Sequence, residues 1–167
     1  MKCKWRYRTP KGFDDLLVCE ADGVLTELRF ESSCSEGKHS DACAKKGVET
    51  RSRVGRWLDG YFVGAVPDWL PPMRLDGATP FRRMVSEEMQ RLPFGTVATY
   101  GDIAKRIAAK LGKVRMSAQA VGGAVGWNPI CILIPCHRVI GAGGKLTGYG
   151  GGLKNKIALL KHEGVEL

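Results

Sequence analysis

The chain has 167 residues, and its 26 lysines and arginines outnumber 17 aspartates and glutamates, which gives a formal net charge of +9 at pH 7. Hydrophobic residues make up 44% of the chain, enough for a folded core, which excludes a disordered protein. No apolar run reaches the roughly 18 residues that a membrane span needs, and no signal-peptide core is present. We therefore expect a cytoplasmic protein (nuclear in a eukaryote) whose charge favours a polyanion such as nucleic acid.

The first predicted elements form a β-hairpin. Residues 2–9 alternate charged and aromatic side chains, and residues 15–20 and 24–30 are apolar runs separated by a short turn that contains Gly23. A strand, a turn with glycine and a second strand predict a hairpin in a small antiparallel sheet.

Residues 31–53 are polar and charged, with little hydrophobic periodicity, and we expect a mobile, exposed loop there. This loop contains a Cys-x4-His-x3-Cys pattern formed by Cys34, His39 and Cys43. Structural zinc sites normally close with four ligands at tighter spacings, so the pattern is a weak zinc signal and we predict no bound metal. We expect all six cysteines to be free thiols in a reducing cytosol.

The segment over residues 54–69 mixes apolar residues with glycines and is compatible with a helix or with a last strand. A Pro-Pro pair then interrupts regular structure, and residues 73–78 are expected to be a linker. We therefore predict two domains, residues 1–75 and residues 76–167.

Three helices are predicted next. Thr79, as an N-cap before a proline, opens a helix over residues 81–92 with apolar positions at helical spacing. Thr99 is the expected N-cap of a second helix over residues 100–111, and a short basic turn leads to a third over residues 117–126. Two helices joined by a turn with glycine predict a helix-turn-helix with the last helix as the DNA reader.

The predicted reader helix has unusually small side chains. Ser117 is followed by alanines, one glutamine and the consecutive pair Gly122 and Gly123. Each glycine inside a helix costs about 1 kcal/mol relative to alanine, so the pair needs a reason. The glycines permit close packing against another helix, or they allow a helix without bulk to lie deep in a groove of DNA. The residues alone leave both explanations open.

A cysteine and a histidine then follow each other inside apolar sequence. The thiol of Cys136 attacks only as a thiolate, and its ordinary pKa of about 8.5 keeps it mostly protonated at neutral pH unless a base assists. Because Pro135 favours extended structure before it, we expect a four-residue apolar strand that delivers Cys136 into a tight turn. His137 would reach the sulfur directly or through one water, with Glu163, at the end of a predicted helix over residues 154–163, setting its tautomer. The alternative is a buried, inert cysteine beside a core histidine.

Several short segments occur in a fixed order between residues 79 and 164. They are Thr79-Pro80-Phe81, Gly95-Thr96-Val97, Thr99-Tyr100-Gly101, Ala118-Gln119-Ala120-Val121-Gly122, Asn128-Pro129-Ile130, Ile134-Pro135-Cys136-His137-Arg138-Val139, Gly148-Tyr149, Lys156 and His162-Glu163-Gly164. In this order and spacing they closely resemble the O6-alkylguanine-DNA alkyltransferases, also called methylated-DNA–protein cysteine methyltransferases.

The resemblance implies an α/β (α+β) fold. A small N-terminal ribonuclease-H-like sheet domain with a structural role would precede a mostly helical C-terminal domain with the helix-turn-helix. It also implies a suicide DNA repair reaction without a cofactor, in which the cysteine takes and keeps the alkyl group from O6-alkylguanine and from O4-alkylthymine. The implied partner is double-stranded DNA containing O6-alkylguanine, bound by a monomer.

The resemblance further assigns roles around the nucleophile. Cys136 would be the methyl acceptor, His137 a water-mediated base and Glu163 the residue that orients it. Tyr100 would promote rotation of the target phosphate and donate its hydroxyl proton to the guanine ring. Arg138 would brace the structure through a salt bridge.

The resemblance also assigns a substrate pocket. Asn128 would fix the turn between the reader helix and the active-site segment, and the carbonyl of Val139 would accept from the exocyclic amine of guanine. Tyr149 would form a wall for the alkyl group. Gly150 would offer its N–H to O6 at a position where some relatives have serine, so that larger alkyl groups fit. The glycine-rich residues 141–152 do not fit the phosphate-binding P-loop pattern and are expected to form the pocket rim.

For DNA binding, the resemblance implies that the reader helix enters the minor groove, which suits small side chains. The damaged nucleotide must then be flipped out, since O6 lies inside a base-paired stack. Many relatives fill the vacated stack with an arginine where this chain has Gln119, so we expect weaker support for flipping. The implied DNA contacts are Thr99, Tyr100, Ser117, Ala118, Gln119, Ala120, Gly122 and Gly123.

Two other classes of protein remain open from the sequence. A non-catalytic lesion sensor is disfavoured because sensors that resemble this family have tryptophan at the position of Cys136. A cysteine hydrolase with turnover would use Cys136, His137 and Glu163. The number of alkyl groups processed by each chain separates the three classes.

Overall fold

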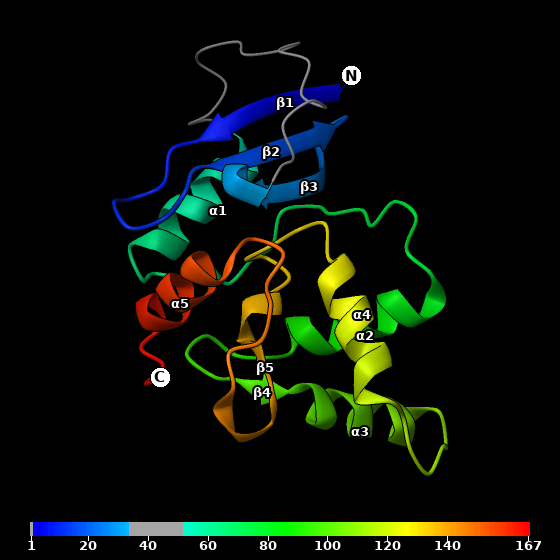
Figure 1. Cartoon of the computed structure of the whole chain (residues 1–167). Helices are drawn as coiled ribbons and strands as arrows, with labels where there is room; N and C mark the ends of the chain where they lie inside the picture. Colours follow the sequence, from blue (N-terminus) through cyan, green and yellow to red (C-terminus); the bar gives the residue numbers. More distant parts are fainter. Residues whose placement is uncertain (1, 34–51) are drawn as a thin grey trace. The chain divides into compact units, whose positions relative to one another are not determined.

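The computed structural model describes residues 2–33 and 52–167 (Figure 1). It divides into two compact units, residues 1–76 and residues 77–167, and the predicted linker spans this division. Cys34, His39 and Cys43 lie outside the described residues, so the predictions about the loop and its metal stay predictions. In the described ranges, no helix is both long and apolar enough to cross a bilayer.

The first unit is built on an antiparallel sheet in the order β1-β2-β3. Its strands are β1 (Lys2–Tyr7), β2 (Leu16–Ala21) and β3 (Val24–Phe30). Asp22 and Gly23 connect β2 to β3, with φ angles of 53° and 77°. A two-residue loop with positive φ at both positions matches the twist of the strands that it joins, and Asp-Gly is among the sequences that adopt it most readily. The predicted hairpin is therefore confirmed.

The helix α1 (Arg53–Phe62) completes this unit and decides between the two structures considered for residues 54–69. It begins after Ser52, whose Oγ accepts from the N–H of Gly55 at 3.0 Å. Its buried face carries Trp57, Leu58 and Tyr61. The helix is tied to β1, since the Tyr7 hydroxyl donates to Oδ1 of Asp59 at 2.8 Å.

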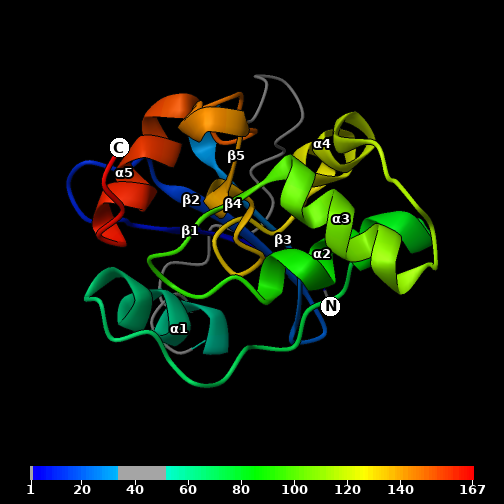
Figure 2. The same cartoon turned by 90° about the horizontal axis from the view of Figure 1, so that it is seen from below.

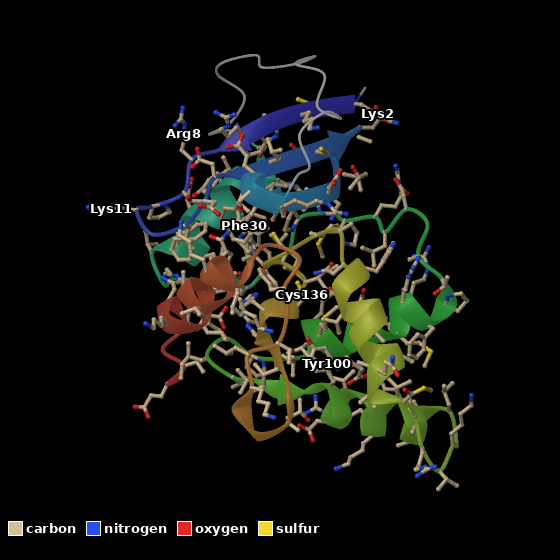
Figure 3. The ribbon with its side chains drawn as sticks, viewed as in Figure 1. Lys2, Arg8, Lys11, Phe30, Tyr100 and Cys136 are labelled. Carbon is tan, nitrogen blue, oxygen red and sulfur yellow. The ribbon has the colours of Figure 1, made fainter. Side chains whose placement is uncertain are left out.

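The start of the predicted linker belongs to the sheet of the first unit. Met73 forms an isolated parallel bridge with Leu25 of β3. The N–H of Leu25 donates to the Pro72 carbonyl and the N–H of Arg74 donates to the Leu25 carbonyl, each at 2.9 Å. Figure 3 labels Lys2 at the start of β1 and Arg8 just after the end of that strand. The α/β class is confirmed, while the ribonuclease-H-like assignment of this unit stays a prediction.

The second unit contains the predicted helices. They are α2 (Pro80–Gln90), α3 (Tyr100–Lys110), α4 (Ala118–Trp127) and α5 (Leu153–His162). Thr79, Thr99 and Ser117 cap the first three as the sequence predicts, with each side-chain oxygen accepting from a backbone N–H three residues on. Helices α2, α3 and α4 pack against one another (Figures 1 and 2).

A short parallel pair, β4 (Ala98–Thr99) and β5 (Val139–Ile140), runs through the core of this unit. It joins the residue before α3 to the residues that follow the Cys-His pair. The fully buried side chains of this unit include Val85, Ile103, Ile107, Val121 and Ile130. The start of α3 and the active-site segment are thereby held in one core.

Candidate active site

Cys136 follows a buried turn. The sequence predicts a four-residue apolar strand before it, and this prediction is wrong. The N–H of Leu133 donates to the Cys131 carbonyl at 2.8 Å, and Ile132 has φ +67°, a region that a β-branched residue rarely occupies. An apolar run indicates burial, which a buried turn satisfies as well as a strand does.

The side chain of Asn128 supplies the hydrogen bonds that strand pairing would have given. Its Nδ2 donates to the carbonyls of Ile130 at 3.2 Å and Ile134 at 2.8 Å, and its Oδ1 accepts from the N–H of Ile130 at 3.1 Å. These are the contacts that the predicted turn-fixing role of Asn128 requires.

Cys136, His137 and Arg138 form a single turn of 3-10 helix, η2 (Cys136–Arg138). Successive residues in such a turn rotate by about one third of a circle, so adjacent side chains point in different directions. The Nδ1 atom of His137 is buried and has no hydrogen-bond partner among the described residues. Of the two routes considered from the sequence, a direct bond between His137 and the sulfur is therefore absent, which leaves the route through a water.

Glu163 forms the centre of a buried ionic cluster. Its Oε1 lies 2.7 Å from Nε2 of His137, and its two carboxylate oxygens lie 2.8 and 2.9 Å from Nε and Nη2 of Arg138. The guanidinium also donates to the Leu92 carbonyl at 2.6 Å. Burial by itself raises the pKa of Glu163, but the bonds from His137 and Arg138 outweigh it and hold the pKa far below its usual range.

Gly95 completes this cluster. Its N–H donates to Oε2 of Glu163 at 3.1 Å. Its φ is +75°, and a Cβ atom at this position would lie 2.9 Å from the backbone carbonyl of Glu163. Only glycine meets both conditions without strain, so the close approach of these two segments depends on it.

The cluster fixes the state of the histidine. Burial lowers the pKa of His137, although the Glu163 carboxylate opposes this shift, so we assign a neutral imidazole at neutral pH. Because the ionised carboxylate accepts a hydrogen bond from the N–H at Nε2, the lone pair of a neutral ring lies on Nδ1. His137 is thus arranged to accept one proton at Nδ1.

The surroundings of the Cys136 sulfur have opposing effects on the pKa of its thiol. Cys136 is 7% exposed. Burial raises the pKa of the thiol, while hydrogen bonds from Asn128 and Tyr149 and the positive charge of Lys156 lower it. Burial prevails, so the resting group is a thiol. The thiolate therefore has to form during the reaction.

Lys156 is a residue of this site that the sequence analysis names among the family segments but to which it assigns no role. It is fully buried, and its Nζ donates to the carbonyls of Val139 at 2.7 Å and Thr147 at 3.2 Å. Burial lowers its pKa, and the charge of Cys136 opposes that shift. The available signal was a lysine on the side of α5 that also carries Leu159 and Leu160. The Val139 carbonyl, predicted to accept from guanine, already accepts from Lys156 with one of its two lone pairs.

Four residues of the predicted site come from three separate segments. Figure 3 shows Cys136 on the segment that follows α4 and Tyr100 at the start of α3. Tyr149 is partly exposed and lies near enough to the Cys136 thiol to lower its pKa. Gly150 is exposed, and a Cβ atom built on it meets nothing within 4 Å, so a serine side chain has room there.

The exposed face of α4 carries the predicted DNA contacts. Ser117, Ala118, Gln119, Ala120 and Gly123 are exposed, while Val121, Ala124 and Val125 face the core. A Cβ atom on Gly123 would meet nothing within 4 Å, and one on Gly122 would touch only the ring of Tyr100, at 3.7 Å. Close packing against another helix therefore does not explain the glycine pair, and the explanation by a groove remains.

A helix-turn-helix with a small-residue surface, next to a buried cysteine served by a histidine and a glutamate, defines a DNA-binding protein with a cysteine nucleophile. Residues 80–165 match the family described as 6-O-methylguanine DNA methyltransferase, DNA binding domain. The chain belongs to the 6-O-methylguanine DNA methyltransferase family.

Individual relatives, compared by sequence and by structure, support the same family. The methylated-DNA–protein-cysteine methyltransferase of Mycolicibacterium paratuberculosis is 47% identical over 153 residues, which cover 89% of this chain and 85% of that protein. The O6-methylguanine methyltransferase structure from Mycobacterium tuberculosis superposes with a TM-score of 0.74 at 35% identity, covering 98% of this chain and 93% of that one. A structure of the M. tuberculosis protein OGT in complex with DNA matches with a TM-score of 0.73 at 34% identity, covering 96% and 91%.

Proposed function

We propose that this chain repairs double-stranded DNA by moving the alkyl group of O6-alkylguanine onto Sγ of Cys136, once per molecule. The observation that carries the proposal is the buried pair of His137 and Glu163, with 2.7 Å between Nε2 and Oε1 and with His137 in the same turn as Cys136. Family membership and the DNA complex of a relative support the type of partner and reaction.

The first step is proton removal. A bridging water carries the proton of the Cys136 thiol to Nδ1 of His137, which becomes an imidazolium stabilised by the Glu163 carboxylate. The new thiolate is stabilised by hydrogen bonds from Asn128 and Tyr149 and by the charge of Lys156. The thiolate is therefore favoured only after Nδ1 of His137 has accepted the proton.

The second step is alkyl transfer. The sulfur forms a bond to the alkyl carbon as the bond between that carbon and O6 of guanine breaks, and the bonding electron pair leaves with the guanine. Tyr100 donates its hydroxyl proton to the ring, so guanine departs as a neutral base, and the proton held by His137 restores the tyrosine through solvent. Because the thioether is stable, the protein is spent after one transfer.

The third element is access to the base. The alkyl group on O6 lies within the base stack and Cys136 is buried, so the nucleotide must leave the duplex. Ser117 and Ala118 to Ala120 of α4 would lie in the minor groove, and Gln119 would fill part of the vacated space. Acceptance of O4-alkylthymine and a monomeric state, which the family resemblance implies, and a cytoplasmic location, expected from the sequence, are further parts of the proposal.

Counting products tests the proposal against its rivals. The protein is incubated with a molar excess of duplex oligonucleotide containing O6-methylguanine, and restored guanine is measured over time. We expect restoration to stop at one guanine per chain in the parent and to be absent in Cys136→Ser, with Cys131→Ser as the matched control that behaves as the parent. Continued turnover would indicate a hydrolase, and no restoration by the parent would indicate a lesion sensor.

A further inference from the structure

The hydroxyl of Thr147 donates a hydrogen bond to the hydroxyl of Tyr100, with 3.3 Å between the two oxygens. In the described part of the chain, this is the only hydrogen bond of the Tyr100 hydroxyl. Thr147 lies in the predicted pocket rim, and no motif or family segment assigns it a function. The contact reaches the atom from which Tyr100 would give its proton.

The tyrosine is held firmly on its side of this contact. It is the first residue of α3, directly after a capping box in which the Thr99 hydroxyl accepts from the Asp102 N–H at 3.0 Å and the Asp102 carboxylate accepts from the Thr99 N–H at 2.9 Å. One edge of its ring lies against Gly122 of α4. With backbone and ring fixed, the direction of the O–H bond is the remaining freedom.

The threonine is held as firmly. Its N–H donates to the Lys145 carbonyl at 3.1 Å, and its own carbonyl accepts from Nζ of the buried Lys156 at 3.2 Å. Its Cγ2 methyl lies over Gly141, where a Cβ atom would approach to 3.1 Å. The same lysine donates to the Val139 carbonyl. Thr147 is thereby tied to the segment that carries the nucleophile.

We propose that Thr147 is a positioning residue for alkyl transfer and acts through Tyr100. A phenol has one proton to donate and can accept from another donor. When the Thr147 hydroxyl donates to the phenolic oxygen, the proton of Tyr100 is left for the guanine ring. As Tyr100 gives up that proton, negative charge develops on its oxygen, and the Thr147 hydroxyl stabilises this charge.

This inference rests on the proposed function and adds a donor for the leaving-group step. Hydrogen bonds to charged groups contribute more than bonds between neutral groups, so the effect is largest in the transition state. The pair is exposed, and water partly replaces a lost donor. We therefore expect the loss of the Thr147 hydroxyl to slow transfer by about tenfold.

A double-mutant cycle tests the inference. Single-turnover rate constants for transfer from O6-methylguanine duplex DNA are measured for the parent, Thr147→Val, Thr147→Ser, Tyr100→Phe and the double variant Thr147→Val with Tyr100→Phe. Valine keeps the shape of threonine without the hydroxyl, and serine keeps the hydroxyl. We expect Thr147→Val to be slowed, Thr147→Ser to restore most of the rate, and Thr147→Val to have no further effect once Tyr100 is phenylalanine. Affinity for undamaged duplex and the unfolding midpoint should match the parent in the threonine variants.

Three results would overturn the inference. They are parental rates in Thr147→Val, equal slowing in Thr147→Ser, and a threonine effect that persists in the Tyr100→Phe background, which would indicate a structural role of the rim. All three leave the proposed function intact, because the parent still transfers one alkyl group. A parent that transfers none would overturn both proposals.

Discussion

Nε2 of His137 and Oε1 of Glu163 lie 2.7 Å apart, with both side chains entirely inaccessible to solvent. The two residues are 26 positions apart in the sequence, and the pair is closed from the other side by Arg138. This arrangement fixes which nitrogen of the histidine accepts a proton. The predictions below for Glu163 and for the pH dependence of stability and rate follow from it.

Replacing Glu163 by glutamine removes the charge that stabilises the imidazolium. We expect Glu163→Gln to slow alkyl transfer by about a hundredfold or more. We also expect it to lower the free energy of unfolding by about 3 kcal/mol, because Arg138 stays buried without its counterion. Single-turnover kinetics and urea unfolding measure the two effects. Glu166→Gln, an exposed carboxylate three residues later, is the control, and equal effects in both variants would contradict the assignment.

The pH dependence of stability follows from the lowered pKa of Glu163. A carboxylate with a lower pKa in the folded than in the unfolded state stabilises the fold above the unfolded value and loses this contribution as the pH falls through the acidic range. His137, whose pKa is also lowered by burial, acts in the same direction at somewhat higher pH. We expect unfolding free energies to decline below about pH 6.5, the ordinary value for histidine. The decline in the carboxylate range should be shallower in Glu163→Gln, and parallel curves for the two proteins would speak against the coupling.

The rate of transfer should persist into mildly acidic solution. Because the pKa of His137 is lowered, its Nδ1 remains able to accept a proton below the ordinary histidine value. The acidic limb of the rate profile is therefore expected below about pH 6.5. Rate constants collected from pH 5 to 8 locate it, and a midpoint above the ordinary histidine value would show that the imidazole is not in the assigned state.

Lys156 is expected to assist formation of the thiolate. Lys156→Met removes the buried ammonium group that donates to the carbonyls of Val139 and Thr147.

 In Lys156→Met the Cys136 thiol should therefore react more slowly with alkylated DNA and with a small thiol reagent such as iodoacetamide. The reason is that the pKa of this thiol rises further when the cation is lost. Lys154→Met, an exposed lysine of the same helix, is the matched control. Parental reactivity of Cys136 in Lys156→Met would contradict this role.

Gly150 is expected to widen the pocket for larger alkyl groups. Since a side chain at this position meets open space, Gly150→Ser should fold normally and should reduce the rate for O6-benzylguanine relative to O6-methylguanine. Competition between the two substrates in one reaction gives the ratio directly. Gly148→Ser, where a Cβ atom also has room, serves as the control, and an unchanged ratio in Gly150→Ser would remove the basis for a widened pocket.

Gln119 is expected to support the flipped state weakly. It is exposed at the start of α4, so Gln119→Ala should reduce base flipping on duplex DNA and Gln119→Arg should increase it. A fluorescent base analogue beside the lesion reports the extruded fraction. Identical fluorescence changes in the parent and in Gln119→Ala would exclude a role for this side chain.

The elements that local chemistry defines were predictable from the sequence. The hairpin at Asp22 and Gly23 and the helices capped by Thr79, Thr99 and Ser117 depend on residues close together in the chain. The grouping of Cys136, His137 and Glu163 in one site was predicted from the need of a thiol for a base and from the family resemblance.

The features that were missed depend on distant contacts. The buried turn at Ile132 replaces a strand because Asn128 supplies its hydrogen bonds, which apolar periodicity does not reveal. The place of Lys156 against the Val139 carbonyl and the contact of Thr147 with Tyr100 join separate segments. The raised pKa of the Cys136 thiol follows from its burial, a property of the assembled core.

The central claim is that Sγ of Cys136 accepts and keeps the alkyl group. Intact-protein mass measurement after incubation with excess O6-methylguanine duplex, followed by peptide mapping, tests it most directly. We predict a gain of one methyl group per chain, located on Cys136 and stable over time. An unchanged mass, more than one methyl group, or a methyl group on Cys131 instead would contradict the account.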